Sequence, residues 1–157
     1  MTGWVGFDLD GTLAEYDVGG PYMGPRSVGR PIKPVVDVVR SILAKGGRVK
    51  ILTARVSSGG EDAATARKTI EAWCVENIGE VLPITSEKDY RMIELWDDRA
   101  VQVLPNEGLP IQDVLVDALK LLVETLDSGN LPSGLRYNIE SFIDGCRDRN
   151  LTVKKVV

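Results

Sequence analysis

The fold of this 157-residue chain is decided by residues 4–13, which read WVGFDLDGTL. Residues 4–7 have the apolar character of a buried central strand, and Asp8-Leu9-Asp10-Gly11 follow as its exit turn. In an open α/β sheet, ligands bind at the carboxyl ends of the strands, where Asp8 and Asp10 would lie. Carboxylates gathered there repel one another unless a cation is present. The pattern indicates a site for a hard, oxygen-preferring ion such as Mg²⁺, although a bare Asp-x-Asp is also typical of a turn capped by Asp.

Composition narrows the function classes. The chain is 43% hydrophobic and 27% charged, which is typical of a soluble globular protein. No apolar run has the length of a membrane span and no signal peptide is visible, so we expect no membrane partner. The two cysteines, Cys74 and Cys146, indicate a reducing compartment, so we expect a cytoplasmic protein. A net charge of −4 without a Lys/Arg run disfavours nucleic acid as a partner, but a nucleotide substrate is compatible with it.

Two residue types restrict the chemistry further. The chain has no histidine, which excludes Ser-His-Asp hydrolysis, histidine phosphatase chemistry and His-ligated zinc. Any general acid or base must therefore be Asp, Glu, Lys, Tyr or Cys. The two cysteines lack metal-site spacing, and Cys74 falls on the apolar face of a predicted helix, so we expect it to be a core residue.

Strand-like and helix-like segments alternate as far as residue 104. Apolar runs predict strands at 48–52, 81–84, 92–96 and 100–104, and amphipathic periodicity predicts helices at 35–45 and 61–77. This alternation predicts an α/β fold with a mostly parallel sheet and helices on both faces. Two more helices are predicted at 111–126 and 135–149. We expect residues 1–108 to form the core and 109–157 a helical extension packed on the same domain, which could also support a homodimer.

Four later residues carry further polar groups at the ends of strands or shortly before a strand. Thr53 closes the strand at 48–52, and Asp97-Asp98 close the strand at 92–96, while Lys88 precedes that strand. With residues 7–13 as motif I, Thr53 as motif II, the lysine and the Asp pair as motif IV, the chain resembles the haloacid dehalogenase superfamily of Mg²⁺-dependent phosphatases and phosphotransferases. The resemblance covers residues 4–108, and strings such as WDDRAVQV, residues 96–103, look like a compact phage and bacterial group.

The resemblance implies a three-layer, Rossmann-like fold and a specific mechanism. Asp8 would attack phosphorus to form an aspartyl phosphate, and Asp10 would act as general acid and then general base. Thr53 and Lys88 would hold the transferring oxygens, and Arg55 could also contact an anion. The implied function is a phosphomonoester hydrolase.

The resemblance also implies how the metal is held. Mg²⁺ would bind the carboxylate of Asp8, the main-chain carbonyl of Asp10 and the carboxylate of Asp97. Consecutive side chains on a strand point in opposite directions, so Asp97 and Asp98 need not both bind the metal directly. We expect Asp98 to support the ligands from behind or to contact the metal through water.

The segments after Asp10 and Thr53 are too short for a separate cap domain, so we expect an open site for a small phosphorylated substrate, or a lid supplied by a partner. Loop residues that could contact substrate are Tyr16, Tyr22, Met23, Arg26 and Arg30. Three alternatives stay open: a phospho-accepting signalling module, a non-catalytic binding module of similar fold, and a nucleotide-specific phosphatase.

Overall fold

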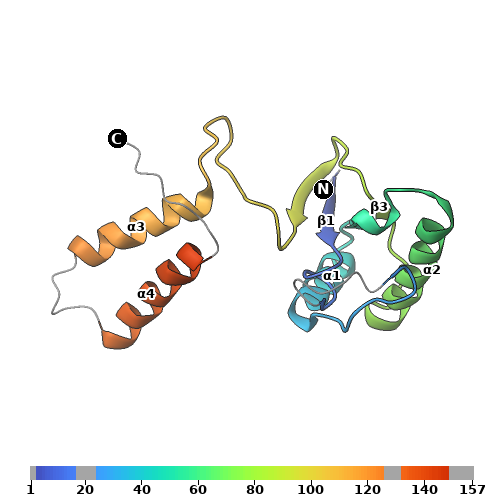
Figure 1. Cartoon of the computed structure of the whole chain (residues 1–157), viewed down its shortest axis with the longest axis horizontal. Helices are drawn as coiled ribbons and strands as arrows, with labels where there is room; N and C mark the ends of the chain where they lie inside the picture. The colour runs from blue at the N-terminus through green and yellow to red at the C-terminus, as the bar shows by residue number, and fades with distance from the viewer. Residues whose placement is uncertain (1–2, 17–23, 126–131, 149–157) are drawn as a thin grey trace. The chain divides into compact units, whose positions relative to one another are not determined.

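The chain divides into two compact units, Met1–Ala100 and Val101–Val157. The structure, a computed structural model, describes residues 3–16, 24–125 and 132–148 (Figure 1). The first unit contains a parallel sheet whose strands run in the order β3-β2-β1-β4. Its elements, in chain order, are β1 (Trp4–Asp8), α1 (Lys33–Ala44), β2 (Val49–Leu52), the short 3₁₀ helix η1 (Ala54–Val56), α2 (Gly60–Asn77), β3 (Ile84–Thr85) and β4 (Met92–Trp96). The predicted α/β class with a parallel sheet is confirmed.

One face of the sheet forms the core beneath the helices. Val5 and Phe7 of β1 are in register with Val49 and Ile51 of β2, so these four side chains share a face. The same buried cluster contains side chains from both helices of this unit: Val36 and Val39 from α1, and Ile70, Trp73 and Cys74 from α2. Cys74 is therefore a core residue, as predicted, and burial raises the pKa of its thiol to about 11.

The other face of the sheet is crossed by the connection between β3 and β4. Trp4 and Lys50 point to this face, because they alternate with the buried residues of β1 and β2. Trp4 Nε1 donates to Asp89 Oδ1 at 2.8 Å, and Lys50 Nζ lies 3.0 Å from Asp89 Oδ2. The ammonium also stands 4.2 Å from the centre of the Trp4 ring. Asp89 thus ties the connection that carries Lys88 to the two central strands.

The helices and β4 lie within two residues of the predicted bounds, but two of the predicted strands differ. The strand predicted at 81–84 is reduced to Ile84–Thr85, and Leu82 is buried in the core. The strand predicted at 100–104 is wrong, since this segment contributes only an isolated bridge between Val103 and Pro110. The chain turns instead, because Asp97 Oδ1 accepts hydrogen bonds from the backbone N–H groups of residues 99 and 100.

The second unit is built around α3 (Ile111–Thr125) and α4 (Ser133–Asp148), close to the predicted helices. The two helices lie against each other, and Val116 and Ile139 are buried in this unit. Residues 101–108, which the sequence assigned to the core, group with these helices. Packing of the extension on the core, and dimerisation through it, stay predictions. In the parts of the chain that the structure describes, no helix is long and apolar enough to cross a membrane.

Candidate active site

Parallel pairing brings three predicted site residues to one edge of the sheet. Asp8 is the last residue of β1 and pairs with Leu52, so Thr53 comes one position beyond it on the neighbouring strand. On the other side, Phe7 pairs with Trp96, so Asp97 follows β4 at the level of Asp8. The carboxyl ends of β1, β2 and β4 therefore present Asp8, Thr53 and Asp97 together, as the sequence predicted.

The ionisation of Asp8 is affected by the three other predicted acids at this edge. Its pKa is raised from 3.8 to about 7, chiefly by burial, and a hydrogen bond from the Leu9 N–H partly offsets that effect. The negative charges of Asp97, Asp98 and Asp10, in decreasing order, contribute the rest of this rise. Each of the other three predicted carboxylates is thus close enough to Asp8 to act on its charge. Such a cluster is stabilised by a bound cation, which would restore the ionised form of Asp8.

Gly11 and Thr12 join the loop after β1 to the loop after β4. Thr12 is buried, and its Oγ1 accepts a 3.1 Å hydrogen bond from the backbone N–H of Asp98. Gly11 has φ +94°, and a Cβ there would come within 2.6 Å of Asp98 Oδ2 and 2.9 Å of Tyr16 Cε1. Only glycine allows this approach. The sequence analysis assigned no role to these two residues, although the Gly-Thr pair after Asp-x-Asp was visible.

Asp10 is held by Arg55, the residue expected to contact an anion. Arg55 Nε donates to Asp10 Oδ2 at 2.7 Å and Nη2 donates to Oδ1 at 2.6 Å, a bidentate ion pair. The Arg55 side chain is only 5% exposed, and that of Asp10 is 24% exposed. Arg55 Nη1 also donates to the carbonyl oxygens of Gly24 and Ser27. In this structure Arg55 therefore positions the predicted acid/base group and anchors the loop between β1 and α1.

Thr53 and Lys88 differ in how firmly they are placed. Thr53 is 3% exposed, its N–H donates to Thr85 O at 2.9 Å, and its Oγ1 accepts from the Arg55 N–H at 3.3 Å. The Thr53 hydroxyl therefore caps the N-terminus of η1, at the edge of the sheet where Asp8 also lies. Lys88 is exposed and bonds to none of the described residues. Its position depends on the neighbouring Asp89, and its contact with a phosphoryl group stays a prediction.

The donor set fits a metal held by few protein ligands. Among residues 3–16, 24–125 and 132–148, no three carboxylate, cysteine or histidine side chains converge closely enough to enclose an ion. The Asp10 carboxylate faces Arg55, and Asp97 uses only Oδ1 in its turn. Mg²⁺ retains several waters and is commonly held by one or two carboxylates, so Asp8, Asp97 and the Asp10 carbonyl form a sufficient set.

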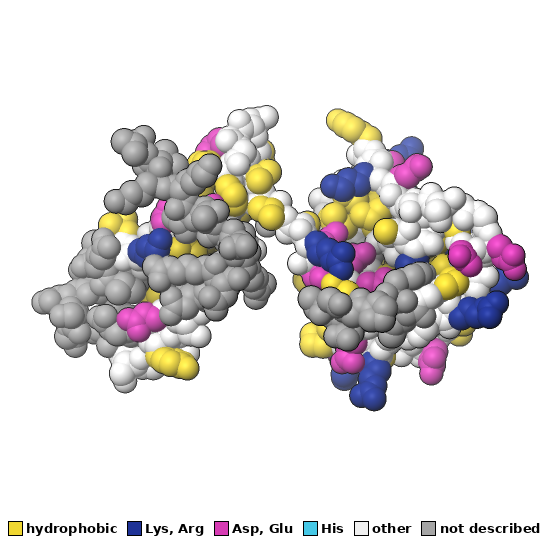
Figure 2. All heavy atoms as spheres, viewed as in Figure 1, with side chains coloured by type: hydrophobic (Ala, Val, Ile, Leu, Met, Phe, Trp, Pro, Cys, Tyr) yellow, Lys and Arg dark blue, Asp and Glu magenta, His cyan; other side chains and the backbone are white. Residues whose placement is uncertain are grey.

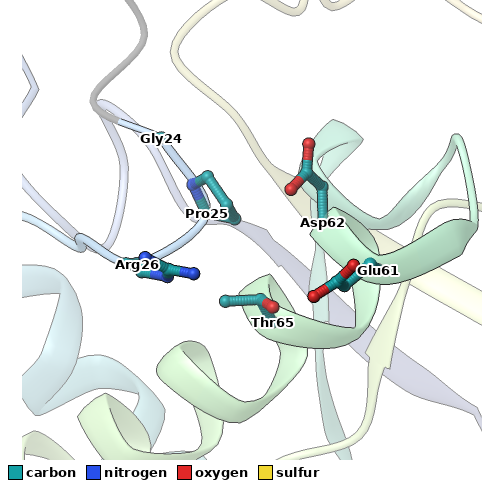
Figure 3. Close-up of a pocket in the computed structure, with 6 residues that line it drawn as sticks. All are labelled: Gly24, Pro25, Arg26, Glu61, Asp62 and Thr65. Carbon is teal, nitrogen blue, oxygen red and sulfur yellow. The ribbon is translucent and has the colours of Figure 1, made fainter.

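A pocket of about 330 Å³ lies beside the Arg55 anchor. Figure 3 shows residues 24–26 on one side and the first turns of α2 on the other, with the Arg26 side chain directed towards Thr65. Glu61 and Asp62 complete the lining. Because Arg55 bonds to both Gly24 and Asp10, one arginine side chain joins the pocket wall to the predicted acid/base.

The structure places the loop residues that we expected to contact substrate in different surroundings. Tyr16 lies against Gly11 at the acidic edge, and Arg26 lines the pocket. Arg30 is exposed, and its carbonyl accepts from the Glu15 N–H. Tyr22 and Met23 lie outside the described residues. The sequence analysis missed Arg99, whose guanidinium hydrogen-bonds the Tyr16 hydroxyl.

Comparison with known proteins leaves the family open. No family model matches the chain, and no curated protein matches it. A solved structure of a conserved protein from Bacteroides thetaiotaomicron aligns with 68% of this chain and 84% of its own, at 18% identity and a TM-score of 0.43. At that level the similarity carries no argument about function.

Proposed function

We propose that the chain is a Mg²⁺-dependent phosphomonoesterase that works through a phosphoryl group on Asp8. The observation that carries the proposal is the half-buried Asp8 carboxylate among three other acids, with a pKa raised to about 7. Repulsion of this kind at a sheet edge is costly without a cation, and it is typical of sites that bind a metal together with a phosphoryl group. The resemblance of residues 4–108 to the haloacid dehalogenase superfamily supports the same function.

In the first step an Asp8 oxygen attacks phosphorus, and the bond from phosphorus to the ester oxygen breaks. Asp10 gives a proton to that leaving oxygen, so the product departs as an alcohol. In the second step Asp10 takes a proton from water, whose oxygen attacks the same phosphorus, and inorganic phosphate leaves Asp8. When bound, Mg²⁺ would neutralise charge on the phosphoryl oxygens. Asp8, Asp97 and the Asp10 carbonyl would hold it.

The Asp10–Arg55 pair imposes a condition on this cycle. Each Arg55 donor bonds to a different Asp10 oxygen, so a proton on the side of the carboxyl that faces the guanidinium would displace one of the two bonds. The freed N–H group could then bind a phosphoryl oxygen. Arg55 would in this way exchange a hydrogen bond to the Asp10 carboxylate for one to the substrate, in keeping with the expectation that it contacts an anion.

The test is hydrolysis of p-nitrophenyl phosphate by the full chain with Mg²⁺ and with EDTA. We expect turnover with Mg²⁺, its loss with EDTA, and a decrease in kcat of about 10³-fold or more in Asp8→Asn, because the nucleophile is removed. Glu76→Gln, at an exposed position on α2, is the matched control and should retain activity. Undiminished activity in Asp8→Asn would refute the assigned nucleophile. A phosphoryl adduct on Asp8 that persists for hours would instead indicate the signalling alternative.

A further inference from the structure

Arg99 is held in a fixed position at the rim of the acidic edge. It follows Asp97-Asp98 in the turn after β4, and its Nη2 donates a hydrogen bond to the Tyr16 hydroxyl. Its guanidinium carbon lies 5.2 Å from the centre of the Tyr16 ring, and its Nε is 3.9 Å from Asp98 Oδ2. The Tyr16 ring in turn lies against Gly11, three residues after Asp8. Stacking, one hydrogen bond and one ion pair therefore orient this guanidinium beside the predicted metal site.

The Arg99 side chain has this orientation although it is 70% exposed. An exposed arginine loses conformational entropy when it is fixed, and a rim ion pair returns little free energy. The Arg99 guanidinium is always charged, and it lies beside the Asp98 carboxylate, one member of the acidic cluster. Within residues 3–16, 24–125 and 132–148, Nη1 of Arg99 makes no hydrogen bond, so none of these residues occupies its N–H groups.

The positive charge of Arg99 at this position would help the site to bind an anionic substrate. Figure 2 shows acidic and basic side chains interspersed over the visible face of the first unit, so no broad positive surface gathers anions there. The acidic edge itself repels a negatively charged substrate. A fixed guanidinium beside that edge offsets the repulsion for one group, and its planar donors match the oxygens of a carboxylate or phosphate.

We propose that Arg99, oriented by Tyr16, is a subsite for a second anionic group on the substrate, a carboxylate or a phosphate separate from the phosphoryl group that is transferred. The inference rests on the proposed function and specifies its substrate class: phosphomonoesters whose remainder is itself negatively charged. Thr53, Lys88 and the metal are the groups expected to hold the transferring oxygens, whereas Arg99 is held by Tyr16 and Asp98.

The test measures binding to the full-length Asp8→Asn protein with Mg²⁺ by isothermal titration calorimetry, so no turnover is needed. The probes are two matched pairs of ligands. For a carboxylate, 3-phosphoglycerate is compared with glycerol 3-phosphate; for a second phosphate, fructose 1,6-bisphosphate is compared with fructose 6-phosphate. In at least one pair, we expect the ligand with two anionic groups to bind about tenfold more tightly than the ligand with one. One charge-assisted contact provides a difference of this size. The pair that shows this ratio identifies the group.

Variants separate recognition from structural support. Arg99→Ala in the Asp8→Asn background should reduce the ratio to about one, and Arg99→Lys should restore part of it, because it keeps the charge but not the planar donors. Tyr16→Phe keeps the ring but loses the hydrogen bond to Arg99. Its ratio of affinities should therefore lie between the ratios of the Arg99→Ala and Arg99→Lys variants. A purely structural role would weaken both members of a pair equally.

Two results would overturn the subsite: a ratio near one in both pairs for the parent protein, or a ratio that Arg99→Ala leaves unchanged. Failure of the p-nitrophenyl phosphate assay together with a ratio that depends on Arg99 would remove the proposed activity but retain the subsite.

Discussion

Asp8→Asn should stabilise the metal-free protein at pH 8, although the same change should abolish the proposed activity. Burial and the neighbouring acids raise the pKa of Asp8 from 3.8 to about 7 in the folded chain. Between these values the folded chain binds a proton that the unfolded chain has released. The free energy of unfolding therefore falls by about 1.4 kcal/mol per pH unit, and the penalty is complete above pH 7. Over about three units this amounts to roughly 4 kcal/mol, and partial exposure of Asp8 lowers our expectation to about 2–4 kcal/mol.

The assay is urea unfolding in EDTA, followed by tryptophan fluorescence. The three tryptophans, Trp4, Trp73 and Trp96, all belong to the first unit, so the signal reports the sheet that carries the site. From pH 5 to pH 8 the advantage of Asp8→Asn over the wild type should grow by about 2 kcal/mol, since the wild-type penalty is still incomplete at pH 5. Glu76→Gln should follow the wild type at both values. Parallel curves for the wild type and Asp8→Asn would refute the claim that burial and neighbouring charge strain this carboxylate.

Three further changes test how the site is held together. Arg55→Ala should lower the free energy of unfolding by about 2–4 kcal/mol, because it leaves a partly buried carboxylate and two loop carbonyls without their donor. In the same urea assay, Arg40→Ala at an exposed pair should lower it by under about 1 kcal/mol. Equal losses would contradict the bidentate pair. Gly11→Ala should cost about 2 kcal/mol and lower the thermal midpoint, because the positive φ and the Asp98 carboxylate exclude a methyl group; an unchanged midpoint would contradict this. Asp89 has a pKa lowered to about 2 by its tryptophan and lysine partners, so its contribution is present above pH 4 and lost as pH falls towards 2. Asp89→Asn should flatten acid unfolding in that range, and an unchanged acid profile would count against the tether.

Local sequence patterns were sufficient for most elements because they report burial directly. The apolar run at residues 92–96 matches β4 without change, and the helices predicted from amphipathic periodicity lie within two residues of α1 and α2. The strand predicted at 100–104 has a similar apolar pattern but is not formed. There the Asp97 carboxylate turns the chain before it can join the sheet, and apolar alternation does not report a side-chain cap.

The candidate site divides in the same way. The Asp pairs and Thr53 were found because strand ends are readable and parallel strand ends share one edge. The partners of these residues were not found. Arg55 reaches Asp10 across 45 residues, Thr12 reaches Asp98 across 86, and Arg99 reaches Tyr16 across 83. No spacing rule links such positions, because each contact depends on how two loops approach after the sheet has formed.

The sequence by itself determined that this chain forms a parallel α/β sheet with carboxylates at its carboxyl edge, since hydrophobic periodicity and the order of strand ends are local properties. The tertiary structure alone decided the electrostatic state of that edge. Burial and three neighbouring charges set the pKa of Asp8, Arg55 paired with the Asp10 carboxylate, and Tyr16 bonded to Arg99 beside Asp98. The physical reason is that desolvation and Coulomb interactions depend on distances between loops, and those distances exist only in the folded chain.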